Sequence, residues 1–388
     1  MLARPGYPGV TVALALALMA CASGTPAAAP GRGAPAAGGS ASAPAAGGAN
    51  APGAAPGEAG APAANAPASA DAPPLVTLKI AAQPSIPSAA RYVAIERGYF
   101  REEGIEMEEV PSTTSAQMLP SLAAGQVDMG LGGAAAGLFN AIAQGIPVRM
   151  TLDMWTAYPD DRGGGLIMRK DLVDGGQVRD FGDLAGLRIA VTSKGHATEY
   201  ALDRGLSKGG LSLADVEMTE LSYPDMNVAL GNRNIDGAVT IEPYGTQAVV
   251  QGFAARFKPW PDLILYDTPA TIMFSESFAE TRTDLARRFA KAYVRGLRDY
   301  DQARAQGKDR EAVIAIIQKH VPFLERPMYD QIPWPPSNPD GRVNADAIAA
   351  AQDWFAEHGY VQTKVDLTKV VDNQFADYAV AQLGPYQP

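Results

Sequence analysis

Hydrophobic and polar positions alternate along the chain with two different periods from residue 75 onward. In "LVTLKIAAQPS" apolar side chains stand at every second position, which predicts a half-buried strand. In "AARYVAIERGYF" they lie three to four residues apart, as on one face of a helix, and Gly98 stands where that helix would end. The two periods keep alternating, so the pattern predicts strand–helix–strand units with parallel sheets, an α/β protein.

One helix-to-strand segment of this pattern occurs twice in similar sequence. "MLPSLAAGQVDMG" begins at Met118 and "MNVALGNRNIDGA" begins at Met226, and each predicts a helix followed by a strand. The elements before each copy come in the same order, so we expect two α/β units of one plan. Asp128 and Asp236 fall at the starts of the two strands, where turn geometry and capping are the expected roles.

The pattern changes after the second unit. "LILYDTPATIMFS" predicts two strands split by a turn, and "DLARRFAKAYVRGLRDYDQA" then predicts a long helix. The late segment "DAIAAAQDWFAEHG" predicts another amphipathic helix, whose apolar stripe includes Trp354 and Phe355. We expect that stripe to belong to a core.

The first 74 residues have a different composition. The apolar run "VTVALALALMA" is too short to span a bilayer and has the length of a signal-peptide core. It ends at Cys21, and small residues before a Cys resemble the bacterial lipoprotein signal. This resemblance implies a signal peptide over 1–20 and a lipid on Cys21; the alternative is an ordinary secretory signal. Residues 21–74 are rich in Ala, Pro and Gly, so we expect a disordered tether.

Charge and cysteine usage exclude several classes of protein. The formal net charge is −10, and the four charges of the leader and tether cancel, so the acidic balance belongs to residues 75–388. An acidic surface argues against nucleic acid as a partner. Cys21 is the only Cys, which excludes an intrachain disulfide and a thiolate zinc cluster. Since no catalytic or metal-binding motif is present either, we expect no cofactor, no metal and no enzymatic activity.

Several segments resemble a known family in their order along the chain. "YVAIERGYFREEGIEMEEV", "SLAAGQVDMG", "DLAGLRIAV" and "IDGAVTIEPY" look like successive landmarks of the ABC-importer solute-binding proteins for alkanesulfonates, taurine, nitrate and the thiamine pyrimidine precursor. The likeness spans about 79–375. It implies a two-lobed type II periplasmic-binding-protein clamshell, with each lobe a mostly parallel sheet flanked by helices. It also implies lobe 1 over 75–168 and 272–388, and lobe 2 over 172–265.

Ligands of open parallel sheets lie beyond the carboxyl ends of the strands. This rule selects loop residues of both lobes: Gln83, Ser85, Thr114, Ser115, Gly133, Ala134, Trp155 and Tyr158 in lobe 1, and Ser193, His196, Tyr223, Glu242 and Tyr244 in lobe 2. We expect Gly133 and Ala134 to face Glu242 and Tyr244. Alternatives remain open, because Trp155 also fits a core and His196 a helix cap.

The resemblance implies a lipid-anchored, extracytoplasmic monomer that captures a small solute and delivers it to an ABC permease with its ATPase. The loop chemistry is mixed: the aromatic residues suit a small heterocyclic, pyrimidine-like solute, and the hydroxyls suit a sulfonate or other oxyanion. Two alternatives are a receptor that presents ligand to a membrane sensor and a pyrimidine-synthase-like enzyme. The enzyme branch depends on a cysteine-rich iron motif, which this chain lacks.

Overall fold

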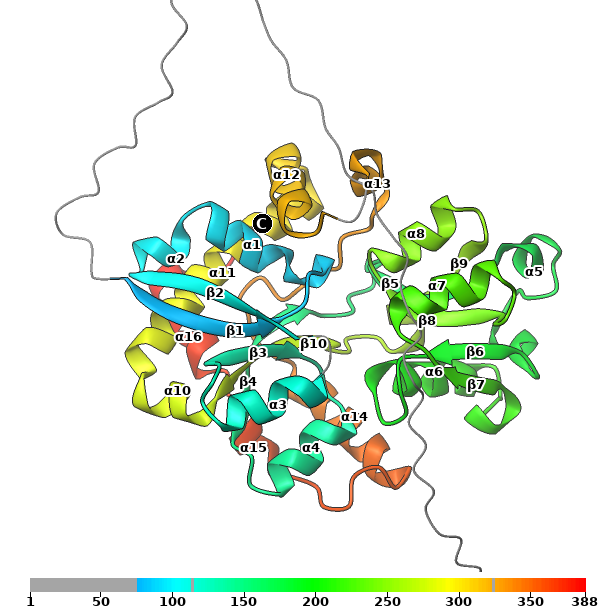
Figure 1. Ribbon diagram of the computed structural model, residues 1–388, viewed down its shortest axis with the longest axis horizontal. Helices are drawn as coiled ribbons and strands as arrows, with labels where there is room; N and C mark the ends of the chain where they lie inside the picture. Colours follow the sequence, from blue (N-terminus) through cyan, green and yellow to red (C-terminus); the bar gives the residue numbers. More distant parts are fainter. Residues whose placement is uncertain (1–74, 113–114, 323–324) are drawn as a thin grey trace, which may run out of the picture. The chain divides into compact units, whose positions relative to one another are not determined.

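The computed structural model describes residues 75–112, 115–322 and 325–388, and their strands form two five-stranded sheets (Figure 1). The signal peptide and tether expected over 1–74, with Cys21, lie outside the described residues, as does Thr114. Among the described helices, none is long and apolar enough to cross a membrane.

The first sheet has the strand order β2-β1-β3-β10-β4. Its strands are β1 (Val76–Ala82), β2 (Ile105–Pro111), β3 (Met129–Gly132), β4 (Val148–Trp155) and β10 (Ala270–Ser275). Strand β1 pairs in parallel with β2 and β3, whereas β10 is antiparallel to both of its neighbours, β3 and β4. The position between β3 and β4 is therefore filled by a strand from far along the chain.

The second sheet repeats this plan with the order β7-β6-β8-β5-β9. Its strands are β5 (Gly164–Arg169), β6 (Arg188–Val191), β7 (Glu217–Glu220), β8 (Gly237–Ile241) and β9 (Ala254–Pro259). Strand β5 is antiparallel to β8 and β9, and β6 is parallel to β7 and β8. In each sheet the single antiparallel strand, β10 or β5, is the first strand after the chain has crossed from the other lobe.

Helices cover both faces of the first sheet because successive strand residues point to opposite sides. Ile272 and Phe274 face one core, and Met273 faces the other. The first face is covered by η1 (Ile86–Ser88), α1 (Ala89–Glu96), α2 (Tyr99–Glu102), α10 (Glu276–Thr281), α11 (Thr283–Gln306), α12 (Arg310–His320), α13 (Arg326–Gln331) and α16 (Gln374–Leu383). The second is covered by α3 (Ser115–Ala123), α4 (Ala136–Ala143), α14 (Ala345–Glu357) and α15 (Leu367–Val370).

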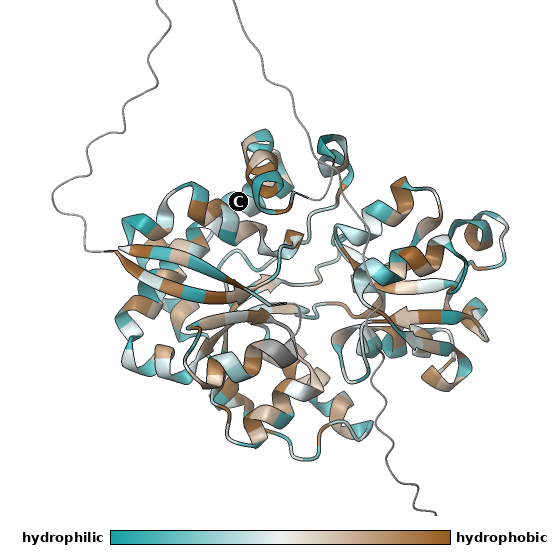
Figure 2. Ribbon diagram, viewed as in Figure 1, coloured by the Kyte–Doolittle hydropathy of each residue, from teal (hydrophilic) through white to brown (hydrophobic). Residues whose placement is uncertain are grey.

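The second sheet is covered in the same way, with Ile189 facing one core and Ala190 the other. One face carries α5 (Lys170–Asp174), η2 (Phe181–Leu184), α6 (Ala197–Lys208), η3 (Leu213–Asp215) and α9 (Trp260–Leu263). The other carries α7 (Tyr223–Gly231) and α8 (Tyr244–Val250). The alternation that produces two covered faces is visible in the first sheet, where Figure 2 shows alternating hydrophilic and hydrophobic bands along β1 and β2.

The structure differs from the sequence predictions at both crossings between the lobes. Residues 164–168, expected in lobe 1, belong to β5 of the second sheet, where β8 and β9 satisfy their backbone groups. The run "LILY" is not a strand: α9 ends at Leu263, and residues 264–269 form the return crossing. Only the second half of that apolar segment becomes a strand, β10.

The repeated helix-to-strand segment is structural in both lobes. Asp128 precedes β3, and its carboxylate accepts from the backbone N–H of Lys79 at 2.8 Å and from Arg282. Asp236 precedes β8 and accepts from the backbone N–H of Arg188 at 3.0 Å. Each Asp also donates its own amide to the carbonyl of that same neighbour. The two copies therefore tie equivalent strands together, a structural role, whereas turn geometry and capping were the expected ones.

Candidate functional site

The predicted site residues lie on loops at the carboxyl ends of the strands. Gln83 and Ser85 follow β1, Gly133 and Ala134 follow β3, Ser193 and His196 follow β6, Tyr223 opens α7, and Glu242 and Tyr244 follow β8. Ser115 is the first residue of α3. Side chains of this set differ widely in exposure: Gln83 is exposed, Ser85 is buried, and Ser193 is half-buried. The loops are thus placed as expected, whereas their individual roles need closer inspection.

The two lobes touch where the β3–α4 loop meets the β6–α6 loop. The amide of Ala136 donates to the carbonyl of Gly195 at 2.9 Å. On the lobe 2 side, Glu199 accepts from the Gly195 amide at 2.6 Å, and Tyr360 of lobe 1 donates its hydroxyl to Glu199 at 2.8 Å. The lobe 2 residue that meets the start of α4 is therefore Gly195.

Gly133 and Ala134 serve packing in this structure. A Cβ on Gly133 would stand 2.1 Å from the Pro269 carbonyl oxygen, so the missing side chain makes room for the return crossing. Ala134 is 6% exposed and belongs to the core under α3 and α4. Gly133 therefore does mark a close backbone approach, but the backbone that approaches it is Pro269 of this chain.

Trp155 lies in a core, the alternative that the sequence left open. It ends β4 of lobe 1 but packs in the core of lobe 2, 2% exposed, and its indole N–H donates to Asp161 at 2.7 Å. Trp260, which follows β9, makes the matching bond to Asp267 at 2.9 Å. The two indoles meet edge to face, with ring centroids 5.0 Å apart. Trp155 thus stands at the start of the first crossing and Trp260 in the helix before the return crossing, and each is hydrogen-bonded to an aspartate further along the chain.

Burial raises the pKa values of these crossing carboxyls. Asp161 is raised to about 7 and Asp267 to about 6, with the tryptophan hydrogen bonds acting in the opposite direction. Asp153 lies on β4, on the N-terminal side of Trp155, and burial likewise raises its pKa to about 7. These acids lie in the low-dielectric hinge region with little compensating charge.

Glu242 has structural partners. It is fully buried, its Oε1 accepts from Arg256 at 2.6 Å, and its Oε2 accepts from the Thr246 amide at 3.0 Å in the first turn of α8. Burial raises the pKa of Glu242, while the Arg256 charge lowers it. The peptide bond between Glu242 and Pro243 is cis. This carboxylate ties α8 to β9.

Two tyrosine pairs remain partly open. Tyr223 and Tyr244 stack with centroids 5.5 Å apart and planes at 21°, both half-buried, at the strand ends of lobe 2. The second pair joins the two crossings: half-buried Tyr158 of the first crossing packs edge to face against Tyr266 of the return crossing, with ring centroids 6.0 Å apart. Tyr266 is 48% exposed and has a left-handed backbone (φ 61°), which is uncommon for a residue with a side chain.

His196 is the N-cap residue of α6 but makes no side-chain capping bond. Its Nδ1 lies 2.9 Å from the Thr192 hydroxyl, and burial lowers its pKa to about 4, so the imidazole is neutral at pH 7. A neutral ring offers a ligand one nitrogen as a donor or acceptor, with no charge.

Sequence reasoning missed a buried arginine. Arg91 lies in the first turn of α1 and is 1% exposed, and its partner is Glu109 of β2. The available signal was a charged residue within an apolar helical pattern, between Ala90 and Tyr92. A buried charge requires a specific partner, so a charged residue in such a pattern indicates a candidate site residue.

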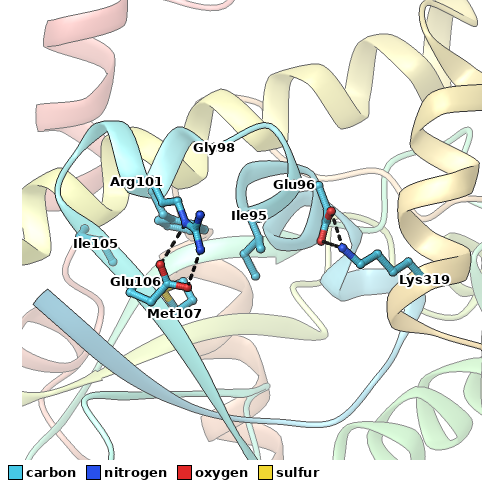
Figure 3. A pocket seen from close by; sticks show the side chains of 9 residues that line it. Ile95, Glu96, Gly98, Arg101, Ile105, Glu106, Met107 and Lys319 are labelled. Carbon is cyan, nitrogen blue, oxygen red and sulfur yellow. Dashed lines mark hydrogen bonds and ion pairs between the residues drawn. The ribbon is translucent and has the colours of Figure 1, made fainter. Parts of the chain in front are cut away.

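A cavity of about 320 Å³ lies away from these loops, at the far end of α1 (Figure 3). Its apolar lining residues include Ile95 and Met107. Its rim carries two ion pairs, Arg101 with Glu106 and Lys319 with Glu96. Because these charges neutralise one another, the rim offers no unpaired group to a charged solute. A second cavity, of about 430 Å³, lies beside α4 and α15. In the described part of the chain, no cluster of His, Cys, Asp and Glu could hold a metal ion.

Comparison with known proteins agrees with this architecture. A family model described as NMT1/THI5 like matches residues 86–305. A protein of Escherichia coli (strain K12) named for binding aliphatic sulfonates is 25% identical over 284 residues, 72% of this chain and 82% of the relative. The riboflavin-binding protein RibY of Chloroflexus aurantiacus is 25% identical over 334 residues, 80% of this chain and 89% of the relative.

Among solved structures, the ligand-binding component of an ABC-type import system from Staphylococcus aureus superposes with a TM-score of 0.65 at 14% identity. It covers 78% of this chain and 98% of its own. The two mixed sheets flanked by helices are therefore the fold of the two-lobed periplasmic binding proteins. The family match extends over more than half of the sequence, and the chain belongs to the NMT1/THI5-like family.

Proposed function

We propose that this chain is the extracytoplasmic solute-binding protein of an ABC-type importer, which captures a small solute between its lobes and delivers it to a permease and its ATPase. The observation that carries the proposal is the duplicated plan: two sheets whose parallel strands end in loops, with the β3–α4 loop of one lobe against the β6–α6 loop of the other. Ligands of such sheets lie beyond those ends. Both curated relatives described above are named as binding proteins, which supports the same function.

We further propose that residues 75–388 act as one solute-binding domain and as a monomer. Cys21 would carry the lipid, and residues 21–74 would tether the domain to the membrane. The receptor for a membrane sensor is the competing function, since the same two-lobed domain would serve it. A permease and an ATPase encoded beside this chain would favour transport.

For the ligand, we propose a small solute with a planar ring that rests against the Tyr223–Tyr244 pair. Two parallel phenol rings at 5.5 Å, both half-buried, offer an aromatic face beside the strand ends of lobe 2. The name of the riboflavin-binding relative is consistent with a ring-bearing solute. The sulfonate-binding relative favours the second candidate, an oxyanion.

Native mass spectrometry of the purified chain tests the proposal. We expect a retained solute of low mass that unfolding the protein releases. Tyr244→Ala should weaken its retention if a ring stacks there, and Tyr378→Ala, which removes a tyrosine of α16, is the matched control. Absence of a retained solute, together with no thermal shift from sulfonates or riboflavin, would count against solute binding.

A further inference from the structure

A buried polar cluster at the carboxyl ends of β1 and β2 has more hydrogen-bond donors than acceptors. Arg91 uses Nη1 to bind Glu109, whereas its Nε and Nη2 atoms are buried and without a partner in the described part of the chain. Ser85 and Ser88, on the turn before α1, share a hydrogen bond of 3.0 Å. All of these groups except Glu109 are less than 9% exposed.

The members of this cluster lie close to one another. The Arg91 guanidinium lies over the Tyr92 ring, 4.7 Å from its centroid, and Tyr92 also stacks with His320 at 4.3 Å. The pKa of Tyr92 is raised by burial, and Arg91, Glu109 and Ser88 also act on it, as expected for neighbours. The cluster follows β1 directly, so it lies at the edge of the sheet where solutes bind in this fold class.

A guanidinium is always charged and its N–H groups point in fixed directions, so burial makes partners for each of them favourable. Glu109 supplies one counter-charge, but its side chain is 33% exposed and can move outward without leaving water. Arg91 also belongs to the first turn of α1, where Ser88 makes no side-chain capping bond and the helix dipole favours negative charge. An acceptor with two or three oxygens would satisfy Arg91 better than Glu109 does.

We propose that Arg91 holds the anionic group of the solute, a sulfonate or carboxylate, and that Glu109 occupies this position in the unliganded chain. The inference rests on the proposed solute-binding function and narrows its ligand class to anions. Arg91 is then a specificity-determining residue, and Glu109 competes with the ligand for the guanidinium.

The test compares two variants of the full chain, Arg91→Met and Glu109→Gln, by titration calorimetry and thermal melts. The probes are ethanesulfonate and acetate, with neutral dimethyl sulfone as the control. We expect wild type to bind at least one anion and not the sulfone. Arg91→Met should reduce that affinity at least tenfold without lowering Tm, because it removes unpartnered buried donors. Glu109→Gln should raise the affinity several-fold, because it removes the competing charge.

A purely structural Arg91 gives the opposite pattern. Arg91→Met would then lower Tm and leave anion affinity unchanged, and Glu109→Gln would not increase it. Failure of both anions to bind wild type also overturns the inference. The proposed function has a separate readout: if a neutral solute is retained in native mass spectrometry and Arg91→Met retains it equally, solute binding stands and the assignment of Arg91 falls.

Discussion

At the scale of single residues, several polar and aromatic side chains of the strand-end loops have structural roles. Glu242 accepts from the Thr246 amide of α8 and pairs with Arg256, and Trp155 is hydrogen-bonded to Asp161 within a core. The sequence shows that such residues stand at the ends of strands. It cannot show whether the space beside them is filled by the chain, because that depends on which segment returns there, as Pro269 does beside Gly133.

Asp236 illustrates a residue whose effect should be on stability alone. Its carboxylate accepts from the Arg188 amide and from the guanidinium groups of Arg188 and Arg169, at 2.8 to 3.0 Å. Asp236→Ala should therefore lower the free energy of unfolding by about 2–4 kcal/mol, because Arg188 loses its carboxylate, Arg169 loses one of two, and the Arg188 amide loses an acceptor. Urea denaturation measures this. Asp174→Ala, which removes an exposed pair with Lys170, is the control and should change it by no more than about 0.5 kcal/mol.

Asp161 should make stability depend on pH. Its folded-state pKa of about 7 lies above the value of about 3.9 expected when unfolded. The contribution of Asp161 to stability is therefore complete below about pH 4 and is lost as the pH rises through about 7. Asp161→Asn keeps an acceptor for Trp155 and should flatten the fall in stability between pH 5 and 8, measured as urea midpoints.

His196 acts in the opposite sense and has to be separated from this effect. Because burial lowers its pKa to about 4, its contribution is present above about pH 6.5 and lost as the pH falls through about 4. The difference between wild type and Asp161→Asn at each pH cancels the His196 part. Equal pH slopes for the two proteins would show that Asp161 titrates normally.

At the scale of helices and strands, the sequence predicted most of the elements. Strands β1, β3 and β8 and helices α1, α3, α7, α11 and α14 lie where the periodicity placed them. Strands β5 and β9 went unassigned, and β5 has apolar residues on consecutive positions. A strand buried on both faces shows no alternation, so its sheet cannot be read from its sequence.

Elements of one lobe also pack into the core of the other. Tyr200 of α6 lies in a core of lobe 1 beside Trp354 and Phe355 of α14, and the Trp354 indole donates to Asp203 at 2.7 Å. Since α14 was predicted only to cover its own lobe, the second role of its stripe was missed. The pattern identifies a buried face and does not identify what covers it.

The hydrogen bond from Tyr360 to Glu199 should influence how far the lobes separate. Tyr360→Phe removes a 2.8 Å bond to a buried carboxylate and should raise the population of open forms about tenfold, given about 1.5 kcal/mol for a bond to a charged group. Spin labels on one introduced Cys in each lobe report the distance distribution, and residues 75–388 contain no competing Cys.

Tyr99→Phe provides the control for that measurement. It makes the same chemical change, but the hydroxyl of Tyr99 donates to Asp299 within lobe 1. The distance distribution should match that of wild type. If Tyr360→Phe also left it unchanged, the contact between Tyr360 and Glu199 would be a fixed part of the hinge.

At the scale of the whole molecule, the N-terminal 74 residues should serve anchoring and contribute nothing to folding. Residues 22–74 contain no apolar side chain large enough to build a core. Cys21→Ala should release the chain from the membrane fraction, because the tether has no other anchor. Fractionation and immunoblotting measure this, and deletion of 22–74 should leave Tm unchanged. A variant that still sediments with membranes would contradict the lipid assignment.

The interior place of β10 in the first sheet limits the order in which the two sheets can form during synthesis. Strands β1 to β4 emerge first, but β3 and β4 have no partner between them until residues 270–275 follow. Lobe 2, whose strands all lie between 164 and 259, is continuous and can complete its sheet earlier. Until β10 is made, β3 and β4 therefore present open strand edges, which are prone to pair with other chains. The lobe that is synthesised first is the one that closes last.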